Sequence, residues 1–255
     1  MPATACLIQD RLGLGTGCGA LDFNQGCSGY VYGLSLAKGL IEGGMARRVL
    51  LLTGETYSKH LHCADRTVRT IFGDGASATV IRAVESDRDL LGPFVLGTDG
   101  RGARQLVVRA GAFRLPAAVS HGSEPCEAGG ARSCGHLYMN GPEIFTFTLK
   151  TIPGLVRRLL AEASLSIEDV DFFVFHQANR FMLERLRDKI GIPVERFCIN
   201  LETYGNTVSA TIPMAIEAAI AAGQMKPGQR IMAVGFGVGY SWGACLLTAP
   251  GELTK

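Results

Sequence analysis

Two segments of this chain resemble each other closely. The first, residues 27–55, reads "CSGYVYGLSLAKGLIEGGMARRVLLLTGE", and the second, residues 206–237, reads "NTVSATIPMAIEAAIAAGQMKPGQRIMAVGFG". Each begins with small residues, continues with apolar positions at helical spacing, passes through a glycine and a basic residue, and ends in an apolar run. Similarity of this kind predicts one α/β unit present twice, with Cys27 and Asn206 in equivalent places.

The apolar runs at residues 49–52 and 231–234 predict strands that are buried on both faces, as in the centre of an α/β sheet. We therefore predict an N-terminal half over residues 1–100 and a C-terminal half over residues 137–255. Residues 101–136, which are rich in Gly, Arg, Ser and Pro, predict a surface excursion between the halves. The C-terminal half adds a helix that Pro142 starts and that Pro153 interrupts or kinks, the strand "DFFVFH", and a helix stopped by Gly191.

The composition favours a compact globular protein. Of the 255 residues 47% are apolar and 19% are charged, and the net charge of +2 gives no sign of a nucleic-acid or membrane-surface partner. No apolar run reaches ~18 residues, and Asp10 and Arg11 interrupt the start where a signal peptide requires an apolar stretch. The eight cysteines form no paired C-x-x-C half-sites, which favours reduced thiols in a cytoplasmic protein.

Three residues are candidates for chemistry. Cys27 falls where a helix begins, among small residues, and the unpaired N–H groups there favour a thiolate. His176 ends the strand "DFFVFH", at the sheet edge where α/β proteins bind ligands. Asn206 occupies the place equivalent to Cys27, so both helix starts are expected to converge on one site. The plainer interpretations, a core cysteine, a structural histidine and a helix N-cap, remain open on position alone.

Six motifs in order carry a resemblance to a known family. They are "ACLIQDRLG", "GCSGYVYGLSLA", "DRTVRTIFGDGASA", "HQAN", "YGNTVSATIP" and "VGFGVGYSWG", and they cover nearly the whole chain. The sequence resembles the ketoacyl synthase III enzymes, which implies a thiolase-type α/β fold of duplicated α-β-α-β-α layered halves with mixed central sheets.

The resemblance also implies which residues form the site. It places the catalytic triad on Cys27, His176 and Asn206, and CoA or acyl-carrier-protein contacts on Arg66, Asn179 and Arg180. The oxyanion hole is expected from backbone N–H groups of Cys27 and of the loop that contains Gly237 and Val238.

The function implied is a decarboxylative condensation that starts fatty-acid synthesis. Cys27 takes the acyl group of an acyl-CoA, and malonyl-[acyl-carrier-protein] then loses carbon dioxide. We expect a neutral His176 N–H and the Asn206 amide to donate to the enolate oxygen, after which the carbanion attacks the acyl-cysteine to give a 3-oxoacyl product. No cofactor or metal is expected, and the family implies a homodimer and an acidic acyl carrier protein as partner.

Other classes of protein match parts of the sequence. A thiolase needs a second cysteine in the glycine loop, and "GFGVGYSWG" has none. A type III polyketide synthase or a specialised-metabolite condensing enzyme shares the Cys-His-Asn set, and a non-catalytic homologue is the remaining class. The dinucleotide-like "GLGTGCG" leads into "ALDF", which predicts a strand rather than a helix. Residues 60–63, "HLHC", lack partner ligands for a metal.

The repeat predicts one further feature. Asn206 is preceded by a helix, a strand and an earlier long helix, whereas only the counterpart of the nearest helix precedes Cys27. The counterparts of the strand and the earlier helix are expected upstream of Met1, on the order of 80 residues in all, which would leave the N-terminal half incomplete and the chain alone poorly soluble or inactive.

Overall fold

The computed structural model describes residues 2–111, 115–116, 123–125 and 131–249. Its core contains the predicted repeat. The first copy is a 3₁₀ turn η1 (Gly26–Ser28), helix α2 (Gly29–Glu42) and strands β1 (Arg48–Glu55) and β2 (Gly75–Arg82). The second copy is η6 (Val208–Ala210), α6 (Thr211–Ala221), β9 (Arg230–Gly237) and β10 (Ser241–Thr248). The order of elements is the same in both, which confirms the duplicated unit.

The copies contribute to two different sheets. Strands β1 and β2 pair antiparallel as a two-stranded sheet. The second sheet has the order β3-β10-β9-β8, with β3 (Leu91–Thr98) and β9 antiparallel to β10, and β8 (Phe172–Phe175) parallel to β9. This second sheet is mixed, as expected. Because β3 belongs to it, the predicted boundary at residue 100 does not separate the two sheets.

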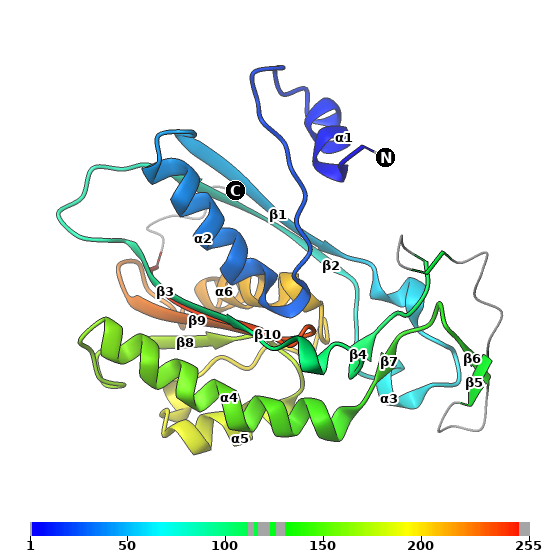
Figure 1. Cartoon of the computed structure of the whole chain (residues 1–255). Coiled ribbons are helices and arrows are strands. Elements are labelled where there is room, and N and C mark those ends of the chain that lie inside the picture. Colours follow the sequence, from blue (N-terminus) through cyan, green and yellow to red (C-terminus); the bar gives the residue numbers. More distant parts are fainter. Residues whose placement is uncertain (1, 112–114, 117–122, 126–130, 250–255) are drawn as a thin grey trace.

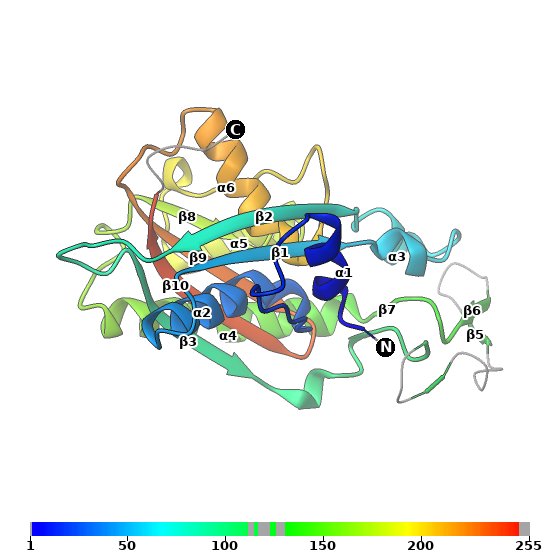
Figure 2. The ribbon, with the colours of Figure 1, turned by 90° about the horizontal axis from the view of Figure 1, so that it is seen from above.

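The layers are visible in two orthogonal views (Figures 1 and 2). Helices α2 and α6 lie between the sheets and contact strands of both. Helices α4 (Gly141–Glu162) and α5 (Arg180–Ile190) cover the opposite face of the four-stranded sheet. Helix α1 (Thr4–Arg11) has no buried residue and lies away from this core. The arrangement positions the starts of α2 and α6 next to each other, deep between the sheets.

Most of the remaining described elements lie between β1 and α4 in the sequence. Helix α3 (Arg66–Arg69) follows β1, and short turns occupy Tyr57–His60 and Gly100–Gly102. In the region predicted as an excursion, β4 (Leu106–Val107) pairs with β7 (Tyr138–Met139), and β5 (Ser123–Pro125) pairs with β6 (Ala131–Ser133). A last 3₁₀ turn, Val194–Arg196, follows α5. No described helix combines the length and the apolar character that a membrane span requires.

Local sequence explains where the C-terminal helices begin and end. The Asn179 side chain accepts a hydrogen bond from Met182 N at 2.8 Å and so caps α5. The same helix ends at Gly191, whose φ of +85° is the left-handed conformation that terminates helices. The end at Gly191 was predicted from the sequence. Pro153, in contrast, does not interrupt α4, because the helix continues from Gly141 to Glu162 through it.

Two other expectations were wrong. The run at residues 49–52 is not buried on both faces: Leu50 is 41% exposed and Leu52 37%, while Leu51 points inward against α2. Its counterpart in β9 is buried on both faces because α2 and α4 cover opposite sides of that strand. The segment "ALDF" is not a strand. Residues 20–25 pair with no strand and lead directly into η1.

Gly235 of β9 allows η1 to lie directly against the sheet. A Cβ at that position would stand 2.8 Å from Ser28 Cα and 3.0 Å from Cys27 O, which are backbone atoms that cannot rotate away. We expect Gly235→Ala to lower the free energy of unfolding by about 1–3 kcal/mol, as overpacking typically does. The matched control is Gly39→Ala on α2, where a Cβ meets nothing within 4 Å and the helix gains about 0.5–1 kcal/mol. Denaturant unfolding measures both, and equal stability of the two variants would contradict the argument.

Candidate active site

Cys27 lies in η1, one turn before α2, and its side chain is 3% exposed. The preceding Gly26 adopts φ +56°, and a Cβ added to Gly237 of β9 would stand 2.7 Å from Cys27 Sγ. Glycine at 237 is therefore required for the sulfur to reach its position against the end of β9.

His176 directly follows β8 and continues its pairing with β9. Its backbone N–H donates to Val234 O at 2.7 Å, which fixes the residue at the carboxyl end of the strand. The side chain is 2% exposed, and its Nδ1 lies 2.7 Å from Thr211 Oγ1 at the start of α6. The second half thus supplies both the histidine and the hydroxyl that orients it.

Asn206 is held from both sides by hydrogen bonds. Its N–H donates to Ile71 O at 2.9 Å, and its carbonyl accepts from Gly73 N at 3.0 Å, so a segment of the first half holds its backbone. Its side-chain Oδ1 accepts from Val208 N at 2.9 Å. Because only the amide oxygen can accept that bond, the Nδ2 group is the end left to face the site.

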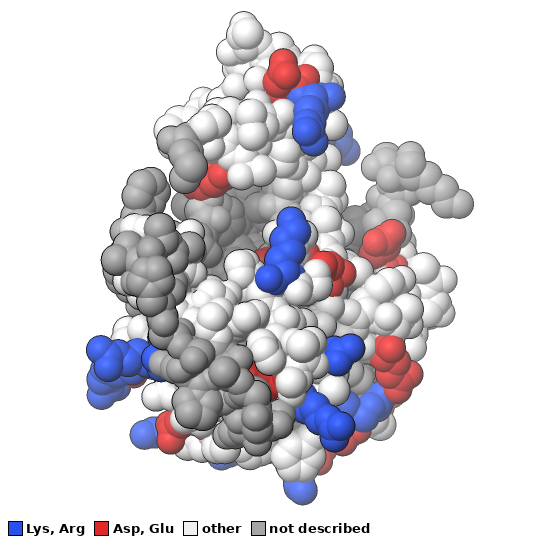
Figure 3. Space-filling view, turned by 90° about the vertical axis from the view of Figure 1, so that its right-hand side faces the viewer, with Lys and Arg blue, Asp and Glu red and all other residues white. Residues whose placement is uncertain are grey.

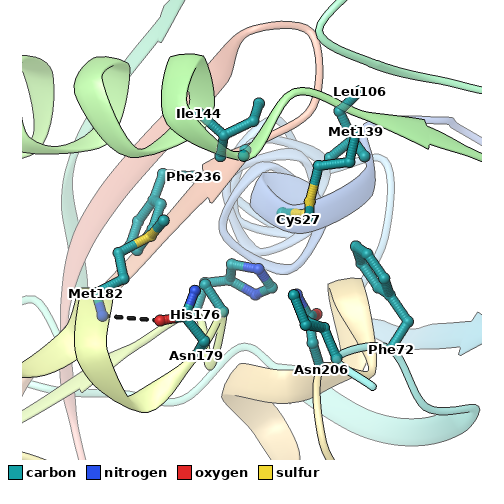
Figure 4. A pocket seen from close by; sticks show the side chains of 14 residues that line it. Cys27, Phe72, Leu106, Met139, Ile144, His176, Asn179, Met182, Asn206 and Phe236 are labelled. Carbon is teal, nitrogen blue, oxygen red and sulfur yellow. Dashed lines mark hydrogen bonds between the residues drawn. The ribbon is translucent and has the colours of Figure 1, made fainter. Parts of the chain in front are cut away.

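These three side chains line one cavity of ≈ 140 Å³ (Figure 4). Asn179 and Gly237, which were also predicted as site residues, line the same cavity. The rest of the wall is apolar except for its backbone, and consists of Ile71, Phe72, Leu106, Met139, Gly141, Ile144, Ala178, Met182 and Phe236. The convergence of Cys27, His176 and Asn206 was predicted from the sequence.

The Cys27 thiol is not activated at rest. Burial raises its pKa to about 12, the backbone N–H groups of Val238 and Cys27 itself act in the opposite direction, and the Glu55 carboxylate raises it further. The sequence suggested that the helix start would favour a thiolate. The structure differs because desolvation of a fully buried sulfur outweighs the two N–H groups that face it.

Burial also governs His176. It lowers the pKa of the imidazole to about 3, and contact with the Val208 backbone opposes this only in part. The ring is therefore neutral near pH 7, as predicted, and neither His176 nor Cys27 carries a charge in the resting site.

Two site-forming residues gave no separate signal in the sequence. Glu55, at the end of β1, accepts from Ser209 Oγ at 2.6 Å, and burial raises the pKa of its carboxyl while hydrogen bonds from Ser209 lower it. Thr211 bonds His176 from the first residue of α6. Glu55 ends the first repeat segment and Thr211 lies inside the motif "YGNTVSATIP", but their partners are 154 and 35 residues away, so only the folded chain reveals the pairs.

Other predicted contacts lie outside the cavity wall. Arg66 is exposed at the start of α3, and Arg180 forms ion pairs with Glu184 at 3.6 Å and with Glu202. Val238 does not line the cavity either, although its N–H faces Cys27. On the face that carries α3, the Lys and Arg side chains are spread among acidic ones and do not gather in one patch of the described surface (Figure 3).

The "HLHC" segment holds no metal-ligating cluster within the described part of the chain, where no group of three His, Cys, Asp or Glu side chains converges. His60 Nδ1 instead lies 3.4 Å from Gly135 O, and the His62 ring packs edge-on against His136 with centroids 4.9 Å apart.

Comparison with known proteins agrees with this geometry. Residues 21–100 match the family model described as 3-oxoacyl-[acyl-carrier-protein (ACP)] synthase III, and residues 160–249 match its C-terminal model. The chain is 40% identical over 250 residues to β-ketoacyl-[acyl-carrier-protein] synthase III 3 of Streptomyces coelicolor, covering 98% of this chain and 72% of that protein. The corresponding synthase of Caldanaerobacter subterraneus is 37% identical, with 96% and 71% covered.

Solved structures give the same result. A crystal structure of a 3-oxoacyl-(acyl-carrier-protein) synthase III superposes with a TM-score of 0.94 at 55% identity, covering 97% of this chain and 74% of that one. The synthase from Burkholderia xenovorans gives 0.88 at 41% identity, with 98% and 70% covered. The fold is therefore of the thiolase type. The chain belongs to the 3-oxoacyl-[acyl-carrier-protein] synthase III family of acyltransferases, as the six motifs predicted.

The raised pKa of Cys27 predicts how this thiol responds to pH. The thiolate is the reactive form, so alkylation of Cys27 by iodoacetamide is expected to be slow at neutral pH and to accelerate as pH rises toward about 12. The exposed Cys6, Cys18 and Cys63 serve as internal controls. Peptide mapping of the alkylated cysteines measures all four rates at each pH. If the rate for Cys27 reached half of its maximum at a lower pH than the rates for the exposed thiols, the burial argument would be contradicted.

Proposed function

We propose that this chain transfers an acyl group from acyl-CoA to Cys27 and condenses it with malonyl-[acyl-carrier-protein]. The observation that supports this most directly is the shared cavity, in which a thiol, a neutral imidazole and an amide with its Nδ2 group free converge from the two halves. The family to which the chain belongs catalyses the initiating condensation of fatty-acid synthesis, and this set of groups suits each of its steps.

The acyl-transfer step requires a nucleophile and donors for a developing oxyanion. Cys27 supplies the sulfur, and the N–H groups of Val238 and Cys27, which already face it, are oriented for a carbonyl oxygen on the carbon that the sulfur attacks. The apolar wall suits a thioester stem and an acyl chain, because little of its side-chain surface is polar.

The decarboxylation step requires a donor at the enolate oxygen of the malonyl thioester. Asn206 meets this requirement because its Oδ1 accepts from Val208 N, and within the described part of the chain no hydrogen bond is formed by its Nδ2 group. An amide donates without adding negative charge, whereas a carboxylate in its place would repel the enolate. Loss of one such donor typically costs ~2.7–4 kcal/mol of transition-state stabilisation.

The remaining assignments follow the family. We propose acyl-CoA and an acyl carrier protein as the partners that deliver the two thioesters, and a homodimer as the assembly. Arg66 and Arg180 are proposed as contacts outside the cavity, near the phosphates of CoA or the acidic surface of the carrier.

Acylation of Cys27 is the first test. Incubation with a panel of acyl-CoAs is expected to add one acyl mass to the intact protein, mapped to Cys27, and Cys27→Ser is expected to show none. Cys198→Ser, a buried cysteine away from the cavity, is the matched control and retains the increment. An acyl mass that persists in Cys27→Ser would refute the assignment.

The donor role of Asn206 is tested separately. Asn206→Ala is expected to accept the acyl group on Cys27 and to release carbon dioxide from malonyl-[acyl-carrier-protein] ~100-fold or more slowly, because the enolate loses its donor. Release of labelled carbon dioxide measures the step. Wild-type release from Asn206→Ala would show that the amide is not the donor.

A further inference from the structure

A short chain of hydrogen bonds determines which nitrogen of His176 carries the proton. His176 Nδ1 lies 2.7 Å from Thr211 Oγ1, and Thr211 Oγ1 lies 2.8 Å from Val208 O. A carbonyl oxygen only accepts, so the single hydroxyl hydrogen of Thr211 points to Val208. The Thr211 oxygen then accepts from His176, which requires a hydrogen on Nδ1.

The Val208 backbone also contacts the His176 ring, and it does so as an acceptor. The Val208 backbone raises the pKa of His176, and a contact that favours the protonated ring must come from an acceptor, which is the carbonyl. The N–H of Val208 is not available for the ring, because it donates to Asn206 Oδ1. The Val208 group that meets the ring is therefore an acceptor, and the nitrogen assignment rests on the Thr211 oxygen, which accepts from Nδ1.

We propose that Thr211 is a positioning residue that holds His176 as the Nδ1–H tautomer, so that Nε2 presents a lone pair to the cavity and accepts the proton of Cys27. This inference rests on the proposed function. It changes the role expected from the sequence, in which a His176 N–H donates to the enolate, because the nitrogen that bears the hydrogen is turned toward α6 and away from the substrate.

The resting state of Cys27 explains why such a base is required. The sulfur is buried and protonated at neutral pH, so a thiolate must be generated when the thioester is in place. His176 lines the same cavity as the sulfur (Figure 4). A neutral imidazole with a free lone pair takes the proton without leaving an isolated charge in the resting site.

The proposed step balances. The S–H bond of Cys27 breaks and its proton moves to Nε2, while the sulfur electron pair forms the bond to the thioester carbon. The oxyanion then collapses, the carbon–sulfur bond to CoA breaks, and the CoA sulfur takes the proton from Nε2. His176 returns to the neutral Nδ1–H form.

The loop from Asn206 to Thr211 thereby assigns both polar groups their roles. Its Val208 N–H occupies the acceptor end of Asn206, which leaves a donor in the cavity. Its Val208 carbonyl accepts the hydrogen of the Thr211 hydroxyl, and the Thr211 oxygen accepts from His176 Nδ1, which leaves Nε2 as an acceptor. This six-residue segment therefore makes His176 the base for acyl transfer and Asn206 the donor for decarboxylation.

The tautomer is measured directly by NMR of protein labelled with ¹⁵N histidine. The five histidine rings are resolved in two-bond correlation spectra, and the His176 signals are identified by their loss in His176→Gln. We expect a protonated Nδ1 and an unprotonated Nε2. A majority of the Nε2–H tautomer, or an equal mixture, would overturn the proposal.

Variants of Thr211 connect the tautomer to the chemistry. Thr211→Val preserves the side-chain shape and removes the hydroxyl, and we expect a mixed tautomer signal and acylation of Cys27 ~10-fold or more slower in a single turnover, within the usual range for general bases. Thr211→Ser retains the hydroxyl and is expected to restore both the signal and the rate. Equal thermal unfolding of the three proteins shows that the fold is intact.

The outcomes separate this inference from the proposed function. Wild-type protein that never acquires an acyl group on Cys27 would refute the proposed function itself. Normal acylation in wild type together with an unchanged tautomer and rate in Thr211→Val would refute only the role of Thr211. A slow rate that Thr211→Ser fails to restore would likewise count against the hydroxyl.

Discussion

Two backbone hydrogen bonds join the halves of this protein at the point where its chemistry is proposed. Asn206 donates to Ile71 and accepts from Gly73, so that a single parallel bridge ties the loop before η6 to the segment after α3. The close approach needs glycine on both sides: a Cβ on Gly205 would stand 2.9 Å from Ile71 O, and one on Gly73 would meet the Tyr204 carbonyl. This bridge fixes the Asn206 backbone against the first half, beside the Glu55–Ser209 hydrogen bond and the packing of η1 on β9.

Burial determines how these residues behave once they are together. The two central helices and two sheets exclude water from the cavity, which raises the pKa of Cys27 and lowers that of His176. Burying a site without charge costs little desolvation free energy. Such a site requires a proton to leave the Cys27 sulfur during acyl transfer. The direction of that proton transfer depends on which ring nitrogen carries the hydrogen, and Nδ1 faces the Thr211 oxygen, whose own hydrogen points to Val208 O.

Much of this arrangement was predictable from the sequence because the chain contains an internal repeat whose two copies can be compared. The repeat placed Cys27 and Asn206 at equivalent helix starts, and His176 followed from its position at the end of a buried strand. The errors have physical causes. Local pattern does not say how many layers cover a strand, so the apolar run predicts burial of Leu50 and Leu52 that the structure does not show. The position of Cys27 at a helix start favours a thiolate, but it carries no information on the desolvation that raises the pKa of the thiol. The pairs Glu55–Ser209 and His176–Thr211 depend on tertiary contact and had no local signal.

The central claim is that one cavity carries an acyl group on Cys27 and discharges it onto a carbanion formed beside Asn206. A single-turnover experiment tests it directly: wild-type protein is acylated with acyl-CoA, freed of excess reagent, and mixed with malonyl-[acyl-carrier-protein] while the Cys27 peptide and released carbon dioxide are followed together. The account predicts that the acyl mass leaves Cys27 as carbon dioxide and a 3-oxoacyl product appear in equal amounts. An acyl group that stays on Cys27 while product forms would contradict it.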